Sequence, residues 1–439
     1  MDTSLLSNSD KSLIEHHVYH EWYLNLRAGG PPGYLANLLN GLNQLSHYDH
    51  PLIVFDTFQG SAPSKNKSKQ KFFIRLVESV FKILPTGSKC YNRYLSRSLK
   101  VSFDQMNGFL STPIYKWLPS EELTNKIDLS LVKTIHVHTV PDVLKIKNYL
   151  REHFRDDIKV ILTCHTPESI ANEQYASNIN DGQPEERARV LADKWLIAEK
   201  KAYEEADIII FPSPEAEEPL LHDIPEFKDI ISKKDIRYMA SGCKPLKSSL
   251  TKEQAKEKYG VSGKFVVGYV GRHNSIKGYD MLKDAAKKIL PNTDNLCFLI
   301  GGAPSSTISP LFDPNWIEAG WVNPADLLRA LDVFVLPNRQ TYYDLILLEV
   351  LSMGVPVIAT ATGGNKSVKK IANDLILCEP NADSLAGAIK NVCQLNESEL
   401  AQIGHNLFES YQKNFTEVCM AERYVETIDK IYKDYNLYP

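Results

Sequence analysis

Two cations follow an apolar run in residues 265–279, which read FVVGYVGRHNSIKGY. The run ends at Gly271, and Arg272 and Lys277 come within the next six positions. A loop that leaves a strand and enters a helix offers free backbone N–H groups and a positive dipole end, so two cations beside it suit a diphosphate. Taken alone, the segment also fits an ordinary surface loop with solvated cations.

An acid lies inside an apolar helical pattern in residues 341–364, TYYDLILLEVLSMGVPVIATATGG. This acid is Glu349, and a strand-like run follows its helix. A carboxylate that is buried without a partner is costly, so Glu349 needs a polar group nearby. A sugar or ribose diol would serve, and so would a salt bridge or an exposed position on the helix.

The first half of the chain contains a glycine-rich stretch, LRAGGPPGYLANLLNGL. We expect Gly29, Gly30 and Gly33 to form a loop ahead of an amphipathic helix, where a phosphate or an acceptor can approach the backbone closely. A plain turn with a helix cap is the alternative interpretation.

Histidines end two strand-like runs in this half. His165 follows the run in KVILTCHTPES, and ligands of open α/β sheets gather at the carboxyl ends of strands. His136 and His138 alternate along TIHVHTV, and we expect them to be packed or polar core residues. The chain has no metal-ligand spacing motif, so zinc is not expected.

These residues require a scaffold of alternating strands and helices. The apolar runs PLIVFDTF, VKTIHVHTV, KVILTCHT and ADIIIFPS occupy the first half, and KFVVGYVG, NLCFLIGG, LDVFVLPN and GVPVIATA the second. Runs that are apolar on both faces and alternate with helical patterns are typical of buried parallel strands. The sequence predicts a doubly wound α/β fold in two copies, with a boundary near residue 245 and a helical tail over residues 397–435.

Length and composition agree with two globular domains in 439 residues. The net charge of -4 gives no field that would draw the chain onto nucleic acid. The seven cysteines form no CxxC pair, and no stretch resembles a signal peptide or a membrane span. We therefore expect a cytoplasmic protein.

Residues 64–100 differ from the rest in charge, with ten basic side chains against the single acid Glu78. Apolar residues recur there at helical spacing, which predicts a basic amphipathic helix. It either packs its apolar stripe on the first domain or docks on an anionic membrane surface, which would place the protein peripherally at the inner face of a membrane.

The second half resembles the C-terminal domain of retaining glycosyltransferases with the GT-B fold, the group with an E-x7-E motif. The matching segments are GRHNSIKG, FLIGGAP, AGWVNPADLLRALDVFVLPN, LLEVLSMGVPVIATATGG and NDLILCEPNADSLAGAI, in the order of the family. The resemblance is firm over residues 265–390 and loose in the first half. Within this group, the chain resembles bacterial enzymes that build surface polysaccharides.

The resemblance implies two Rossmann-like domains that face each other across a cleft. Residues 1–245 would bind the acceptor, residues 246–415 would bind the nucleotide sugar, and a helix in residues 416–439 would return to the first domain. Arg272 and Lys277 would hold the donor diphosphate, and Glu349, the second Glu of the motif, would bind the ribose. His165 would approach the donor sugar, and residues 321–323 would line the base pocket. The remaining implied donor-site residues are Gly30, Gly271, Gly302, Val322, Thr341, Tyr343, Asp344 and Leu345, and the implied acceptor-site residues are Gly29, Gly33 and Tyr34.

The family's activity is transfer of a sugar from a nucleotide sugar to an acceptor, here a glycan or a lipid-linked oligosaccharide, with retention and without a metal or other cofactor. The chain departs from the motif at its first Glu, which falls on Thr341, and E-x-F-G-L reads Thr-Tyr-Tyr-Asp-Leu. Either Asp344 supplies the missing carboxylate, or the site is altered or inactive. A GT-B phosphorylase, a sugar-nucleotide epimerase and a non-catalytic binding partner remain as alternatives.

Overall fold

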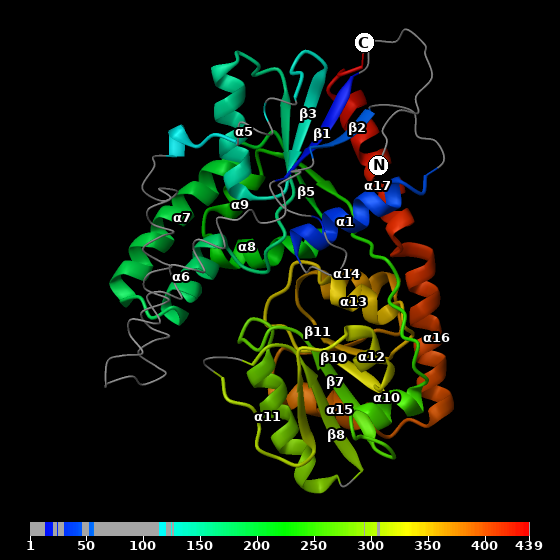
Figure 1. Ribbon diagram of the computed structural model, residues 1–439. Coiled ribbons are helices and arrows are strands. Elements are labelled where there is room, and N and C mark those ends of the chain that lie inside the picture. Colours follow the sequence, from blue (N-terminus) through cyan, green and yellow to red (C-terminus); the bar gives the residue numbers. More distant parts are fainter. Residues whose placement is uncertain are drawn as a thin grey trace, which may run out of the picture.

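The computed structural model contains two parallel β-sheets, each covered by helices, and one lies above the other in the view of Figure 1. It describes residues 14–20, 24, 30–45, 52–56, 114–119, 124, 127–293, 295–304 and 308–438. The basic segment over residues 64–100 and Gly29 lie outside these ranges, so the structure does not bear on them.

The first sheet has the strand order β2-β1-β3-β4-β5-β6, with every neighbouring pair parallel. Its strands are β1 (Glu15–Tyr19), β2 (Leu52–Asp56), β3 (Val132–Val137), β4 (Lys159–Leu162), β5 (Ile208–Phe211) and β6 (Asp235–Tyr238). The connecting helices are α1 (Pro31–Leu42), η1 (Ile114–Lys116), α5 (Val140–Glu152), α6 (Ile170–Asn180), α7 (Glu185–Glu205), η2 (Pro214–Glu217), α8 (Glu218–Asp223) and α9 (Phe227–Ile231).

The second sheet has the order β12-β11-β10-β7-β8-β9 and is also parallel throughout. Its strands are β7 (Phe265–Val270), β8 (Leu296–Gly301), β9 (Trp316–Gly320), β10 (Val333–Leu336), β11 (Val357–Thr360) and β12 (Ile376–Cys378). The helices of this half are α10 (Lys252–Lys258), α11 (Tyr279–Ile289), η3 (Leu290–Asn292), α12 (Pro324–Arg329), α13 (Leu345–Leu351), α14 (Gly363–Ile371), α15 (Ala382–Val392), α16 (Glu397–Asn414) and α17 (Glu417–Asp434).

All eight apolar runs form strands, whereas β1, β6, β9 and β12 lie outside the predicted runs. The strand β1 carries a Glu and two His in its five residues, so it has no apolar signature. The other three are short or partly exposed, and β6, β9 and β12 lie at sheet edges. An edge strand needs fewer apolar side chains because part of it faces solvent.

The predicted boundary near residue 245 lies in the connection between β6 and β7, which belong to different sheets. The helical tail divides in two after Asn414, and the Thr416 hydroxyl caps the new helix by accepting from the backbone of Cys419. Helix α16 lies beside α13 in the second half, and α17 returns to pack on α1 of the first (Figure 1).

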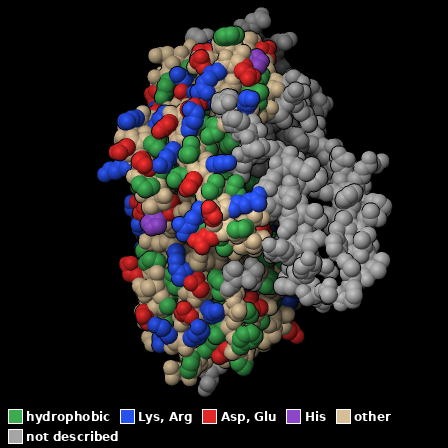
Figure 2. All heavy atoms as spheres, turned by 90° about the vertical axis from the view of Figure 1, so that its left-hand side faces the viewer, with side chains coloured by type: hydrophobic (Ala, Val, Ile, Leu, Met, Phe, Trp, Pro, Cys, Tyr) green, Lys and Arg blue, Asp and Glu red, His purple; other side chains and the backbone are tan. Residues whose placement is uncertain are grey.

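Buried aromatic and aliphatic side chains from α1, α17 and β1 form one core on a face of the first sheet, including Tyr34, Val18 and Tyr424. A second core joins both halves, and a third lies between α11, α15 and the second sheet. The surface over these layers mixes acidic and basic side chains, as the face in Figure 2 shows.

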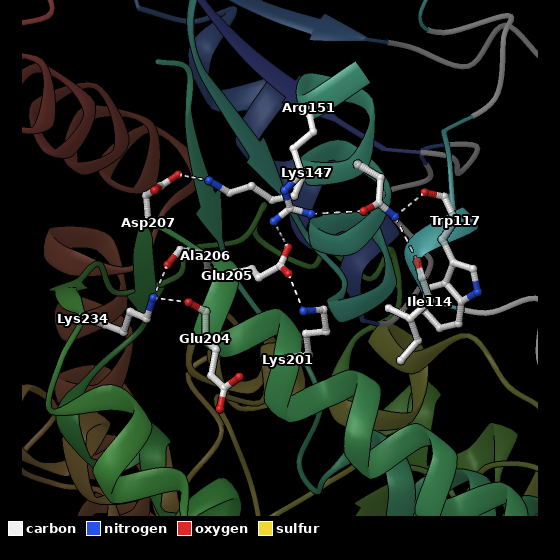
Figure 3. A network of polar contacts seen from close by, with 11 residues as sticks. Ile114, Trp117, Lys147, Arg151, Lys201, Glu204, Glu205, Ala206, Asp207 and Lys234 are labelled. Atoms are coloured by element: carbon white, nitrogen blue, oxygen red, sulfur yellow. Dashed lines mark hydrogen bonds and ion pairs between the residues drawn. The ribbon is translucent and has the colours of Figure 1, made fainter. Parts of the chain in front are cut away.

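A polar network fixes α5 and α7 against the first sheet (Figure 3). Lys147 Nζ donates to Asp207 Oδ2 at 2.6 Å, and the same oxygen accepts from the backbone N–H of Val160 in β4 at 2.7 Å. Arg151 donates to Glu205 at the end of α7 at 2.7 Å. Each of these partly exposed ion pairs contributes little to the free energy of unfolding. Their structural effect is to join α5 to α7 and to the neighbouring strands β4 and β5.

Candidate functional site

The strongest candidate site lies where the second sheet reverses its winding, at the carboxyl ends of β7 and β10. Strand β7 continues toward β8 and β9, whereas β10 continues toward β11 and β12 on the other side. Ligands of open α/β sheets bind at such a switch point. The loop after β7 carries Arg272 and Lys277, and the loop after β10 carries Asn338 and Asp344.

Lys277 and Asp344 join these two loops in a largely buried ion pair. Lys277 Nζ lies 2.6 Å from Asp344 Oδ1, and the side chains are 15% and 17% exposed. Asn338 donates to the other oxygen, Asp344 Oδ2. Burial acts to raise the pKa of Asp344, but the charge of Lys277 and these hydrogen bonds outweigh it and hold the pKa below its usual value. Both carboxylate oxygens of Asp344 are therefore engaged within the protein.

Arg272 faces acidic side chains of the first half. Its Nη1 lies 3.5 Å from Glu173 Oε1 of α6, in a pair that is 56% exposed on the Arg side. Such an exposed pair is weak and exchanges readily with another anion. Glu168 is buried nearby, and burial together with the charges of Glu173 and Asp223 raises its pKa to about 7.

Two successive buried tyrosines beside the Lys277 pair have hydroxyls without hydrogen-bond partners among the described residues. These are Tyr342 Oη and Tyr343 Oη, and Asn338 Oδ1 shares this property. The hydroxyl of the preceding Thr341 is directed to Asp344 and helps to lower its pKa. An unsatisfied buried polar atom costs about 1–3 kcal/mol, and water or a bound ligand can offset that cost. This end of the second sheet therefore has hydrogen-bonding capacity that the described residues do not use.

Glu349 lies in the middle of α13 and is half-buried. No hydrogen bond or ion pair joins its carboxylate to any of the described residues. Burial raises its pKa to about 7. Leu345 begins the same helix and is also half-buried. Glu349 is thus an acid that would gain from a neutral hydroxyl donor, as a ribose diol is.

His165 brings the first half of the chain close to the second. It follows β4 and hydrogen bonds through Nε2 to His138 Nδ1 at 3.0 Å. Its ring centroid lies 4.4 Å from that of Tyr34 in α1 and 6.3 Å from that of Tyr342. Burial lowers the pKa of His165 to about 3, so its ring is neutral. Tyr34, His165 and Tyr342 therefore form one aromatic cluster across the two halves.

The glycine-rich stretch of the first half differs from its prediction. Helix α1 begins at Pro31, so Gly33 lies buried in its first turn and not in a loop ahead of it. Proline is favoured at the first helical position because its fixed φ matches the helix. Gly30 remains in the preceding turn with φ of 67°, and a Cβ there would meet nothing within 4 Å.

Gly271 and Gly302 pack against each other at the ends of β7 and β8. A Cβ on Gly302 would lie 2.1 Å from the carbonyl oxygen of Gly271, and φ at Gly302 is 136°. Contact between two loops thus explains these glycines without a ligand. In the loop after β9, Val322 is half-buried beside Gly301, while Trp321 is 89% exposed.

Polar contacts between the two halves flank the site. The backbone N–H of Gly363 donates to Glu218 at 3.0 Å, and Ser367 donates to Ser213 at 2.6 Å. Gln340 donates to Asp223 at 3.2 Å. None of these contacts was predicted from the sequence, because the partners are far apart in the chain and are ordinary surface residue types.

The described part of the chain contains no cluster of three or more His, Cys, Asp or Glu that could hold a metal ion. Within those same residues, no helix combines the length and the apolar character needed to cross a membrane.

Comparison with known families finds a match in the second half. Residues 264–394 match the family model described as glycosyl transferases group 1. This range includes both loops of the switch point and Glu349.

Three curated relatives share part of the sequence. An N-acetyl-alpha-D-glucosaminyl L-malate synthase of Bacillus anthracis is 27% identical over 189 residues, or 41% of this chain and 49% of the relative. A D-inositol 3-phosphate glycosyltransferase of Geodermatophilus obscurus is 28% identical over 51% of this chain and 52% of the relative. A lipopolysaccharide core biosynthesis mannosyltransferase of Rhizobium meliloti is 31% identical over 26% of this chain and 36% of the relative. The chain thus spans about half, or less, of the length of these relatives.

Solved structures show the same fold. A sucrose-phosphate synthase from Thermosynechococcus elongatus superposes with a TM-score of 0.55 at 16% identity, over 96% of this chain and all of that one. Anabaena HepE in complex with UDP-glucose has a TM-score of 0.50 at 16% identity, over 68% of this chain and 79% of that one. Residues 264–394 are therefore similar to the glycosyl transferases group 1 family, and the two parallel sheets of the chain have the GT-B fold of these solved structures.

Proposed function

We propose that this protein transfers a sugar from a nucleoside diphosphate sugar to an acceptor held by its first half. One observation carries the proposal: Arg272 and Lys277 lie in a switch-point loop of the domain that matches the glycosyltransferase family.

The chemistry follows from charge. As the bond between the sugar and the diphosphate breaks, negative charge develops on the departing phosphate, and cations fixed beforehand stabilise it. Arg272 exchanges its weak pair with Glu173 for the diphosphate. Lys277 is held in place by Asp344 and contacts the phosphate from the side that Asp344 leaves open. Glu349 accepts hydrogen bonds from the ribose, and residues 321–323 line the base pocket.

The donor sugar lies between the two halves in this account. His165, Tyr34 and Tyr342 contact one side of it, and the hydroxyls of Thr341 and Tyr343 offer hydrogen bonds from the other. Thr341 stands where the family motif has a carboxylate, so a neutral hydroxyl replaces an acid at the sugar. We infer transfer with retention, by resemblance to the family, and no metal in the reaction.

The proposed acceptor is a molecule with a free hydroxyl group. The relatives' names include L-malate and D-inositol 3-phosphate as well as a lipopolysaccharide core. We retain a glycan or lipid-linked oligosaccharide as the proposed acceptor, in surface polysaccharide biosynthesis, with small polyhydroxy acids and phosphates as the comparison class.

A second candidate is a glycosyltransferase fold that binds a nucleotide sugar without transferring it. It is favoured by one observation, that Lys277 and Arg272 each already have a carboxylate partner. In that case the donor would bind, but the leaving phosphate would gain little charge stabilisation.

A panel of nucleotide sugars tests both candidates. Thermal shift with UDP, GDP, ADP and their common hexose conjugates should reveal at least one stabilising ligand, because a ligand that binds only the folded state raises Tm. The nucleotide sugar that raises Tm is then incubated with the protein and each acceptor class, and the products are identified by mass spectrometry. Transfer supports the enzyme, binding without turnover supports the second candidate, and no stabilisation by any nucleotide contradicts both.

A further inference from the structure

His138 is a buried residue next to the proposed donor site that the proposed function does not use. It follows directly after β3, at the point where the first sheet reverses its winding between β1 and β3. It is 1% exposed. Its Nδ1 lies 3.0 Å from His165 Nε2, so His138 is the hydrogen-bond partner of the histidine that the proposed function places beside the donor sugar.

The neighbouring buried histidines are fully engaged elsewhere. His136 bonds to Tyr424 Oη at 2.8 Å and to Thr163 Oγ1 at 2.9 Å, so both of its ring nitrogens have partners. His16 bonds to Thr134 Oγ1 at 2.6 Å and to Tyr424 Oη at 2.8 Å. Of these three histidines, only His138 leaves a ring nitrogen, Nε2, buried without a partner among the described residues.

Both rings of the His138–His165 pair are neutral. Burial lowers the pKa of His138 well below its ordinary value, with the neighbouring histidines adding to the effect, and burial lowers that of His165 to about 3. A neutral imidazole carries one N–H, and the 3.0 Å contact between the two nitrogens needs one hydrogen between them. Two assignments are therefore possible.

In one assignment His165 Nε2 donates, and His138 must then carry its own hydrogen on Nε2, where it is buried without an acceptor. In the other His138 Nδ1 donates, and the unpaired Nε2 is a bare nitrogen. Buried N–H groups without a partner are rare in folded proteins, so the second assignment is favoured. It leaves His165 with its hydrogen on Nδ1, for which no described residue supplies an acceptor.

We propose that His138 is a positioning residue: by donating from Nδ1 to His165 Nε2, it holds His165 in the Nδ1–H tautomer, which offers one hydrogen-bond donor to a sugar oxygen in the cleft. The choice of sugar oxygen as the acceptor rests on the proposed function, whereas the tautomer does not. His138 itself touches neither donor nor acceptor. The ring of His138 packs against that of His136, with centroids 4.2 Å apart and ring planes inclined by 37°, and this contact restricts its orientation.

The first test is ¹⁵N NMR of the full chain labelled at histidine. Ring nitrogens with and without a hydrogen have well-separated ¹⁵N shifts, so the spectrum reports the tautomer directly. We expect His165 to show a protonated Nδ1 and a bare Nε2, with signals assigned by their loss in His165→Gln and His138→Asn. A protonated Nε2 on His165 in the wild type would overturn the proposal, and this result does not depend on any turnover.

The second test separates positioning from simple packing. His138→Phe keeps a ring but removes the donor, whereas His138→Asn keeps an N–H near the position of Nδ1. We expect His138→Phe to lower kcat at least tenfold with an unchanged Kd for the free nucleoside diphosphate, and His138→Asn to stay within about threefold of the wild type. Equal losses in both variants would contradict the proposal.

The matched control is His16→Asn, a buried histidine on β1 whose partners are Thr134 and Tyr424. This variant should lower Tm. It should leave the ¹⁵N shifts of His165 unchanged, together with the ratio of kcat to the Kd for the free nucleoside diphosphate. If His16→Asn changes the His165 tautomer as His138→Phe does, the effect is general to the core and the proposal is wrong. If no nucleotide sugar is turned over at all, the proposed function fails while the NMR result still decides the tautomer.

Discussion

Glu349 is the residue whose environment most needs a ligand. Its pKa of about 7 lies above the ordinary 4.5, so the folded state disfavours its charged form. The folded protein therefore gains relative stability from this group below about pH 4.5 and loses it as pH rises toward 7. A ribose diol that donates two hydrogen bonds would favour the ionised form and reverse part of that loss.

For Glu349→Gln we predict opposite effects on stability and on binding. Without ligand at pH 8, the variant should have a higher Tm than the wild type, because no buried charge remains. Its affinity for the nucleotide should fall by about 1.5–3 kcal/mol, roughly ten- to a hundredfold in Kd, because a charge-assisted hydrogen bond is lost. Calorimetric titration at pH 6 and pH 8 measures this, and wild-type binding should be tighter at pH 8. Unchanged affinity would remove Glu349 from the ribose site.

Asp344 neutralises Lys277 in the structure, although the sequence also allowed it to replace the missing motif carboxylate at the sugar. Its two oxygens are bound to Lys277 and Asn338. We predict that Asp344→Asn binds free nucleoside diphosphate more tightly, by about 1–2 kcal/mol or five- to thirtyfold, because a like charge near the phosphates is removed. Asp326→Asn, which breaks the separate pair with Lys258, is the control and should leave affinity unchanged. Weaker binding in Asp344→Asn would show that the carboxylate contacts the ligand.

At the scale of elements, the sequence predicts what local patterns encode. The eight apolar runs become strands, and the cation loop after β7 lies where the pattern places it. Strand β1 escapes prediction because its histidines are buried by partners over a hundred residues away, such as Thr134 and Tyr424. The site shows the same limit: Arg272 and Lys277 are visible in the sequence, but their pairing with Glu173 and Asp344 depends on how the loops meet.

Packing of α17 on α1 gives a prediction at this scale. A Cβ on Gly41 of α1 would lie 2.0 Å from the carbonyl oxygen of Glu417 in α17. Overpacking in Gly41→Ala should cost about 1–3 kcal/mol, which exceeds the gain of roughly 1 kcal/mol in helix propensity. The variant should therefore have a lower free energy of unfolding than the wild type.

The matched control is Gly387→Ala in α15, where a Cβ would meet nothing within 4 Å. That variant should be stabilised by about 0.5–1 kcal/mol. Chemical denaturation of both variants compares the two values. If Gly41→Ala is as stable as Gly387→Ala, the close approach of α17 to α1 is wrong.

At the scale of the whole molecule, residues that follow strands of the two sheets meet: Arg272 lies 3.5 Å from Glu173 of the first half, and the ring of His165 lies 6.3 Å from that of Tyr342 of the second. The first contributes His138 and His165, and the second contributes Arg272, Lys277 and Asp344. Contacts between the halves, such as Glu218 with Gly363, and the return of α17 hold this arrangement. In the proposed function the second half binds the donor's phosphates and the donor sugar lies between the two halves, so transfer would need both halves.

The most direct test of this account is the turnover of the stabilising nucleotide sugar by Lys277→Met and Arg272→Ala. If these cations stabilise the departing diphosphate, each variant should lose about a hundredfold in kcat, near 3 kcal/mol. The Tm of Arg272→Ala should stay close to that of the wild type, whereas Lys277→Met should lower Tm because Asp344 loses its partner in a largely buried ion pair. Turnover is therefore compared at a temperature where all the variants are folded. Lys258→Met, which removes a paired lysine outside the switch-point loops, should retain wild-type turnover. Near-normal turnover in both Lys277→Met and Arg272→Ala would contradict the assignment of the diphosphate to this loop.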